Sequence, residues 1–200
     1  ASYPLDRMRS IRFHLGFRTD ALTFKAQDTL SLSYAPDETK QSYIMSRAEY
    51  VFDNTIKPAI NIYNGARYKV FAEYMYKLNG ETTGGFYNLG ADIRYYKKIY
   101  KNFIWAIRAA GATSNGNMKV LYHMGGVDNW INHKYDDNTP MRPGENYAFE
   151  TLATSMRGYN QNARNGNTYG LISNEFRLPI LTTFIKRPIQ SSMLKNLQAV

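Results

Sequence analysis

The residues best placed to do chemistry in this 200-residue chain are charged side chains in a long loop and on the segment after it. Arg157-Gly158-Tyr159 lies near the end of that loop. Glu175 and Arg177 lie two residues apart on the next segment, where alternation places both on the polar face. A guanidinium held away from bulk water is costly unless a carboxylate pairs with it, and Glu175 is the candidate partner. Gly158 lets the backbone turn tightly, and Tyr159 offers a flat ring with a hydroxyl. We therefore expect Arg157 and Glu175 to form a salt bridge that locks the loop; a surface arginine in a mobile loop is the alternative.

Residues for catalysis or metal binding are sparse. The three histidines, His14, His123 and His133, have no second ligand at metal-ligand spacing, and the lack of cysteine excludes disulfides and thiolate zinc sites. His133 with Asp136 and Asp137 lacks EF-hand spacing and is interpreted as a solvated loop. No Gly-x-Ser-x-Gly motif occurs. The sequence predicts no enzyme, no metal and no cofactor.

Six segments alternate between apolar and polar residues, which is typical of strands with one buried face. They are 11–18, 42–53, 68–77, 87–95, 103–109 and 168–180. Aromatic residues make up 14% of the chain, which also favours β structure, and no run approaches the ~20 apolar residues of a membrane-spanning helix. Strands of about ten residues, with Tyr74, Tyr76, Phe103 and Trp105 towards the ends of the apolar face, are typical of membrane β-barrels. A soluble sandwich could also carry this alternation.

The connections favour an up-and-down barrel. They span 25–41, 54–66, 79–84, 97–102 and 114–167, and every second one lies on the same side of such a barrel. If the longest connection, 114–167, is extracellular, then 54–66 and 97–102 are periplasmic. Periplasmic turns are short, and only 54–66 is longer than this rule predicts. Because loops as long as 114–167 are functional or disordered, and this one is rich in aromatic residues, we expect it to be ordered and folded into the barrel lumen.

The net charge of +9 suggests nucleic-acid binding as an alternative. The cations are dispersed rather than clustered on one face, and the densest group, Lys97, Lys98 and Lys101, is interpreted as a hairpin turn. The charge fits a polar lumen better, and no nucleic-acid partner is expected.

Three motifs resemble the BamA-type outer-membrane assembly and secretion barrels, also called the bacterial surface antigen family. They are Met156-Arg157-Gly158-Tyr159, Asn165-Gly166-Asn167, and the segment 174–180, which contains Glu175 and Pro179. Members of that family carry [Val/Leu]-Arg-Gly-[Phe/Tyr] in the loop before the twelfth of sixteen strands, then Gly-Asn and a Glu-containing strand. Pro58 with Asn64-Gly65-Ala66-Arg67 also resembles the Pro…Gly-[Ser/Thr]-Arg that follows periplasmic turns in the family. Met156 departs from the usual aliphatic residue, and the family's following Phe-x-Asp-x-Gly strand is not in this chain.

The resemblance implies an all-β, antiparallel, up-and-down transmembrane barrel of sixteen strands, of which residues 1–200 would supply roughly the seventh to the twelfth. Six strands cannot close a barrel whose smallest natural size is about eight. The implied role is to assist insertion or translocation of proteins at the Gram-negative outer membrane, with lipids and client proteins or envelope-complex subunits as partners. The loop arginine would bond the inward glutamate. A structural anchor in an envelope complex and a soluble β-sandwich or lipocalin-like binding module are the alternatives.

Overall fold

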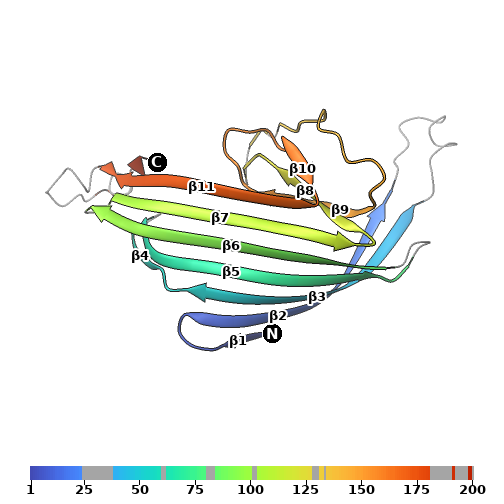
Figure 1. Ribbon diagram of the computed structural model, residues 1–200, viewed down its shortest axis with the longest axis horizontal. Coiled ribbons are helices and arrows are strands. Elements are labelled where there is room, and N and C mark those ends of the chain that lie inside the picture. The colour runs from blue at the N-terminus through green and yellow to red at the C-terminus, as the bar shows by residue number, and fades with distance from the viewer. Residues whose placement is uncertain are drawn as a thin grey trace.

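The computed structural model describes residues 1–23, 38–59, 62–79, 84–100, 103–127, 131–132, 134–180, 191 and 198–199. These residues form two β-sheets (Figure 1). The larger sheet has the order β1-β2-β3-β5-β6-β7-β11-β12, with β4 paired to β5 beside this path. Its strands are β1 (Ser2–Pro4), β2 (Arg9–Leu22), β3 (Thr39–Asp53), β4 (Ile56–Ala59), β5 (Ile62–Lys77), β6 (Gly84–Tyr100), β7 (Phe103–Gly116), β11 (Thr168–Pro179) and β12 (Gln198–Ala199).

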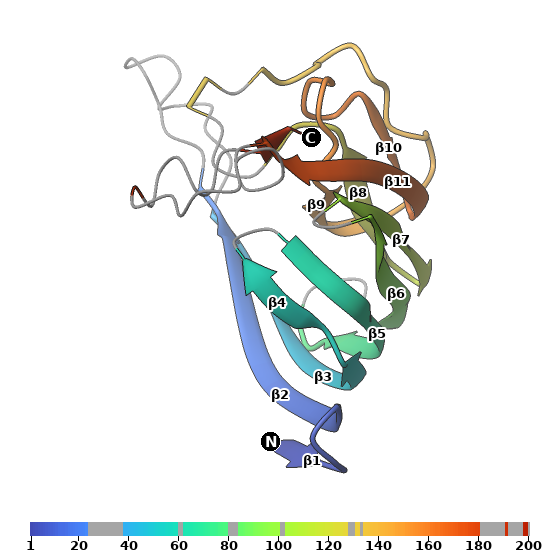
Figure 2. The same ribbon diagram turned by 90° about the vertical axis from the view of Figure 1, so that its left-hand side faces the viewer.

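All six predicted strands are confirmed, as β2, β3, β5, β6, β7 and β11, and every neighbouring pair of them is antiparallel. Most are longer than the alternation indicated, since polar residues at their ends continue the hydrogen-bonded ladder; β6 reaches 17 residues. The described strands form an open sheet rather than a closed barrel, bent into a trough (Figure 2). Within the described ranges, no helix is long and apolar enough to cross a membrane.

One face of the larger sheet, which we call the apolar face, presents large apolar side chains to the outside. The register places Ile11, Tyr50, Val70, Ala91, Gly111 and Gly170 in one row across six strands. Leu15, Phe17 and Ile172 on this face are 72%, 66% and 75% exposed. The charged residues that the six long strands place on the apolar face all lie at or near strand ends; they are Arg9, Lys40 and Lys97.

Aromatic residues gather towards the two ends of the apolar face. Tyr74 and Tyr87 pair directly across β5 and β6 towards one end. At the other end Phe176 stacks on Phe103 and Trp105, with ring centroids 5.8 and 6.2 Å apart. This is the distribution that the alternation predicted for the ends of the strands.

The opposite face, which we call the polar face, carries the charges. Its cations and carboxylates pair along and across the strands, so that Arg47 lies 2.7 Å from Glu49 and 3.6 Å from Glu73. Arg108 likewise lies 2.8 Å from Asp92 on the neighbouring strand. The charged members in the long strands are Arg12, Arg18, Asp20, Arg47, Glu49, Asp53, Arg67, Lys69, Glu73, Lys77, Asp92, Arg94, Lys98, Arg108, Glu175 and Arg177.

The connection between β3 and β5 is largely strand. β4 pairs back onto β5, with Ile56 opposite Asn64 and Ala59 opposite Ile62. The sequence predicts an unusually long turn at 54–66, whereas the structure has a short antiparallel hairpin formed by β4 and the start of β5.

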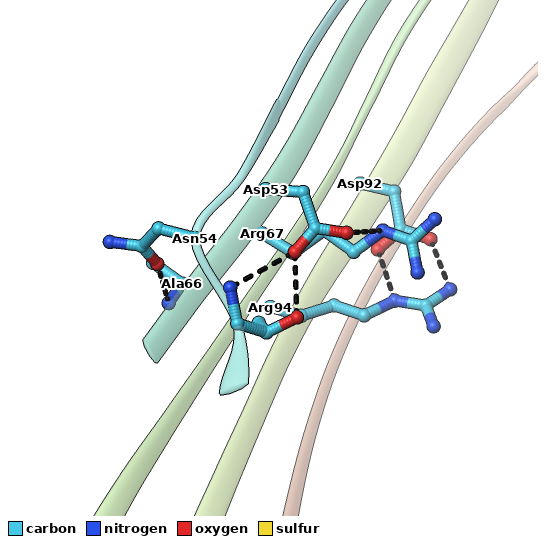
Figure 3. A network of polar contacts seen from close by, with 7 residues as sticks. Asp53, Asn54, Ala66, Arg67, Asp92 and Arg94 are labelled. Carbon is cyan, nitrogen blue, oxygen red and sulfur yellow. Dashed lines mark hydrogen bonds and ion pairs between the residues drawn. The ribbon is translucent and has the colours of Figure 1, made fainter. Parts of the chain in front are cut away.

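Local contacts hold this hairpin at the strand entry (Figure 3). Asp53 accepts hydrogen bonds from the amide and the hydroxyl of Thr55 and lies 3.4 Å from the Arg67 guanidinium. Gly65 has a φ of +117°, and a Cβ there would lie 2.8 Å from Asn54 Oδ1. Only glycine fits this conformation and this approach, which gives Gly65 a physical role in the motif around it.

The described residues of the connection between β7 and β11, which are 117–127, 131–132 and 134–167, fold as a second layer, which we call the loop layer. Its sheet has the order β10-β8-β9, where β8 is Lys119–Met124, β9 is Tyr147–Thr154 and β10 is Arg164–Gly166. Val120 and Tyr122 of β8 are buried against Tyr43, Met75 and Phe86 of the polar face. The loop layer therefore packs on the charged side of the larger sheet, through an apolar cluster at one end of it.

Candidate functional site

The residues predicted to form a site gather around one cavity of about 590 Å³ between the loop layer and the polar face. β6 contributes Arg94 and Tyr96, and β7 contributes Arg108. Glu175 and Arg177 come from β11, and Arg157 and Tyr159 come from the loop layer. Four arginines and one carboxylate thus face a single space, brought together by period-two alternation on adjacent strands and by one returning loop.

Glu175 pairs with its neighbour on the same strand. Arg177 Nη2 lies 2.6 Å from Glu175 Oε2, and Arg177 Nε donates to the same oxygen at 3.0 Å. The two residues are two apart on β11 and therefore point to the same face. Arg177 also lies over the Tyr96 ring, 5.8 Å from its centroid. This pair is charge-assisted and only partly exposed.

Asp92 pairs with two further arginines of the cavity wall. Arg94 donates to both of its carboxylate oxygens at 2.9 Å (Figure 3). Arg108, on the adjacent strand, donates to the same two oxygens at 3.4 and 2.8 Å. One carboxylate is therefore shared by two guanidinium groups, which leaves this wall of the cavity cationic.

Arg157 lines the cavity but does not form the predicted salt bridge. Its side chain is exposed, and among the described residues it has no ion pair. The expected contact with Glu175 is replaced by the Arg177–Glu175 pair, because Arg177 is held on the same strand and face whereas Arg157 arrives from a loop. Gly158 has a φ of +86°, as expected for a tight turn, and Tyr159 is 54% exposed.

The loop that carries Arg157 is held mainly by its backbone. Gly126 N donates to Tyr159 O at 2.9 Å, and Met156 N donates to Gly126 O at 2.7 Å. Gly125 has a φ of +111°, and a Cβ there would clash with the carbonyl of Asn160. Gly125-Gly126 is where two stretches of backbone come into close contact.

Sequence reasoning missed a buried histidine network in the loop layer. His123 Nδ1 lies 2.9 Å from Asn162 Oδ1, and His123 Nε2 lies 2.9 Å from Glu150 Oε2. These residues are 39 and 27 positions apart, and no local spacing indicates that they meet.

Electrostatic contacts also order the loop layer. The Lys119 ammonium, 3.1 Å from Glu145, holds the pKa of that carboxyl below its usual range, with the Tyr147 hydroxyl as a second donor. In the same layer, burial of Tyr122 disfavours the charged phenolate and raises the pKa of its hydroxyl to about 12.

In the part of the chain that the structure describes, no group of three or more His, Cys, Asp or Glu side chains could hold a metal ion. Asp136 and Asp137 are described, whereas His133 lies outside the described residues. Ser114 has a structural role, since its hydroxyl accepts a hydrogen bond from Val120 N at 2.9 Å.

Comparison with known proteins assigns no class to this fold and site. No family model, no curated protein and no solved structure matches the chain. Its function has to be argued from the geometry above.

Proposed function

We propose that the chain forms part of the wall of an outer-membrane β-barrel, with its apolar face in lipid and its polar face towards a water-filled interior. The observation that carries the proposal is the apolar face, with exposed residues such as Leu15, Phe17 and Ile172 and with its charges kept to the strand ends. A soluble sandwich or lipocalin-like module buries such a face and turns its charges outward. The opposite arrangement fits a bilayer.

Strand length and edge pairing support the same proposal. The long strands run from 12 residues in β11 to 17 in β6, more than the ~9–11 that cross a bilayer at a tilt. Among the described residues, β1 is paired with β2 at Ser10–Arg12, and β12 is paired with β11 at Leu178–Pro179. Since unpaired backbone is costly in lipid, further strands would complete the wall on both sides.

The activity we propose follows the BamA-like resemblance: assisting the insertion or translocation of other proteins at the Gram-negative outer membrane. The partners would be lipids and client proteins or envelope-complex subunits, with no cofactor, no nucleic acid and no enzymatic step. The loop layer, packed on the polar face through Val120 and Tyr122, would brace the wall beside the cavity that Arg157 lines. Because this layer covers part of the polar face, a structural barrel anchor is the second candidate.

Cysteine labelling of the full protein in lipid vesicles tests the orientation of the sheet. The chain has no cysteine, so Ile172→Cys and Ser173→Cys each introduce one thiol, on opposite faces of β11. We expect a charged, water-soluble maleimide to label Ser173→Cys, which faces the cavity, and to spare Ile172→Cys. Equal labelling of both thiols in vesicles would contradict the membrane proposal.

A second assay separates the assembly role from the anchor role. Vesicles containing the full protein should speed the folding of an unfolded outer-membrane barrel compared with vesicles containing an unrelated barrel at equal density. Equal folding rates, combined with one-sided labelling in the first assay, would leave the anchor role and reject the assembly role.

A further inference from the structure

His123 is the hub of the loop layer. It lies on β8, the central strand of the small sheet, with a side chain only 6% exposed. Its ring contacts Asn162 through Nδ1 and Glu150 through Nε2, both at 2.9 Å. The Tyr135 ring meets it edge-on, with centroids 5.8 Å apart. One imidazole thus joins β9, the segment before β10 and the segment around residue 135.

The surrounding bonds fix the orientation of the Asn162 amide. Asn162 Nδ2 donates to the backbone carbonyl of Asp136 at 2.9 Å, and a carbonyl can only accept. Asn162 Oδ1 also accepts from Asn165 Nδ2 at 3.1 Å. Asn162 is 3% exposed and has a φ of +62°, so its side chain has little freedom to turn over. The atom that faces His123 Nδ1 is therefore an acceptor, and Nδ1 has to carry a proton.

The second ring nitrogen also faces an acceptor, because a carboxylate offers only acceptor oxygens. A neutral imidazole has one N–H and can satisfy only one of the two contacts, whereas the imidazolium donates in both. We propose that His123 is a pH-sensitive clasp, which in its protonated form ties Glu150 and Asn162 together and in its neutral form releases Glu150.

The direction of the switch follows from which contact can give way. On losing a proton, His123 keeps Nδ1–H for the fixed Asn162 and turns the Nε2 lone pair towards Glu150. The Glu150 side chain is 52% exposed, so it can swing into water. The contact between β8 and β9 is thus made when the His123 ring is protonated and weakened when the ring is neutral.

The other charged groups around the clasp come from the elements packed on it. The segment between β8 and β9 contributes Tyr135, whose pKa is raised by burial and by the charges of Glu150 and Asp137. The carbonyl of Asp136 anchors Asn162, and Arg164 of β10 pairs in register with Met124, one residue past His123. Among the described residues, Glu150 alone makes a charged contact with the ring. Because the clasp lies wholly within the loop layer, its test does not depend on the proposed membrane role.

Hydrogen exchange of the full protein in detergent tests the clasp between about pH 5 and about pH 8, where histidine changes charge. After correction for the intrinsic pH dependence, we expect the amides of 147–154 to exchange about tenfold faster at the alkaline end, the effect of losing one charge-assisted hydrogen bond. Nitrogen NMR should show both His123 ring nitrogens protonated at the acidic end. Equal protection at both ends, or a singly protonated ring at the acidic end, would overturn the proposal.

Two variants assign the effect to His123 and Glu150. His123→Gln and Glu150→Gln should each abolish the pH dependence; if His123→Gln does not fold, Glu150→Gln, at a half-exposed position, still decides. The matched control is Glu145→Gln, an acidic residue of the same layer that pairs with Lys119 and not with His123. It should retain the tenfold difference. A Glu150→Gln protein that retains the pH dependence of exchange would contradict the clasp. A Glu145→Gln protein that loses this pH dependence would contradict it too.

Discussion

Arg177 Nη2 lies 2.6 Å from Glu175 Oε2, while Arg157, which lines the same cavity, has no ion pair among the described residues. Two arginines could neutralise Glu175, and the one on its own strand does so. Strand geometry brings residues two apart to one face with little loss of conformational freedom, whereas an arginine on a loop has to be positioned by the loop. Glu175 is therefore neutralised from its own strand, and Arg157 remains available at the surface of the cavity.

A double-mutant cycle distinguishes these two arginines. Arg177→Ala and Glu175→Ala should show a coupling of about 1 kcal/mol in the free energy of unfolding, as expected for a partly buried pair with two charge-assisted hydrogen bonds. Arg157→Ala and Glu175→Ala should show a coupling of less than about 0.5 kcal/mol, the usual limit for independent sites. Chemical unfolding in detergent measures both cycles. A larger coupling for Arg157 would mean that the loop arginine, and not Arg177, neutralises Glu175.

An added charge on the apolar face should block membrane insertion. Leu15→Arg places a guanidinium among exposed apolar residues of β2 and should destabilise the inserted protein by about 2–4 kcal/mol if the site lies near the bilayer centre. His14→Arg adds a charge one residue earlier, on the polar face and opposite Arg47, and should lower the yield much less. Folding yield in lipid vesicles measures both variants. Equal yields would argue against a lipid-facing surface.

Glycine substitutions should separate a steric contact from backbone strain alone. Gly125→Ala adds a Cβ that clashes with the Asn160 carbonyl at a φ of +111°, so we expect detachment of the Arg157 loop. Gly158→Ala meets no atom within 4 Å and should cost only about 1–2 kcal/mol, from its positive φ. Limited proteolysis of residues 155–161 measures the difference. Equal cleavage of the two variants would show that the Gly125 contact does not hold the loop.

Alkaline pH should loosen the loop layer through Tyr122. The pKa of Tyr122 is about 12 in the folded protein, because burial disfavours the phenolate, against 10.0 for an ordinary tyrosine. Its contribution is complete below pH 10, where both states keep the proton, and is lost as pH rises towards 12, since only the unfolded chain ionises. In the Tyr122→Phe protein, the midpoint temperature of thermal unfolding should fall less between pH 10 and pH 12 than it does in the unchanged protein. Tyr159→Phe, at a 54% exposed ring, is the control and should fall like the unchanged protein.

The strands were predictable because their signal is local. Alternation at 11–18 or 87–95 needs no distant residue, and the faces it assigned to Phe13 and Ile93 are those in the structure. The Asn54–Gly65 contact was not predictable, since a hairpin back onto the next strand leaves no periodic pattern. Nor was the His123 network, in which partners 27 and 39 residues away meet only after the loop layer has folded.

The sequence alone determined that the chain forms long antiparallel strands with one apolar and one charged face, because a pleated strand turns every second side chain the same way. Only the tertiary structure decided which charges pair on the polar face. Ion pairs depend on register between strands and on the path of the 51-residue connection between β7 and β11, and distances between side chains at that separation are set by packing. Packing placed Arg108 on Asp92 of the neighbouring strand and buried His123 between two acceptors.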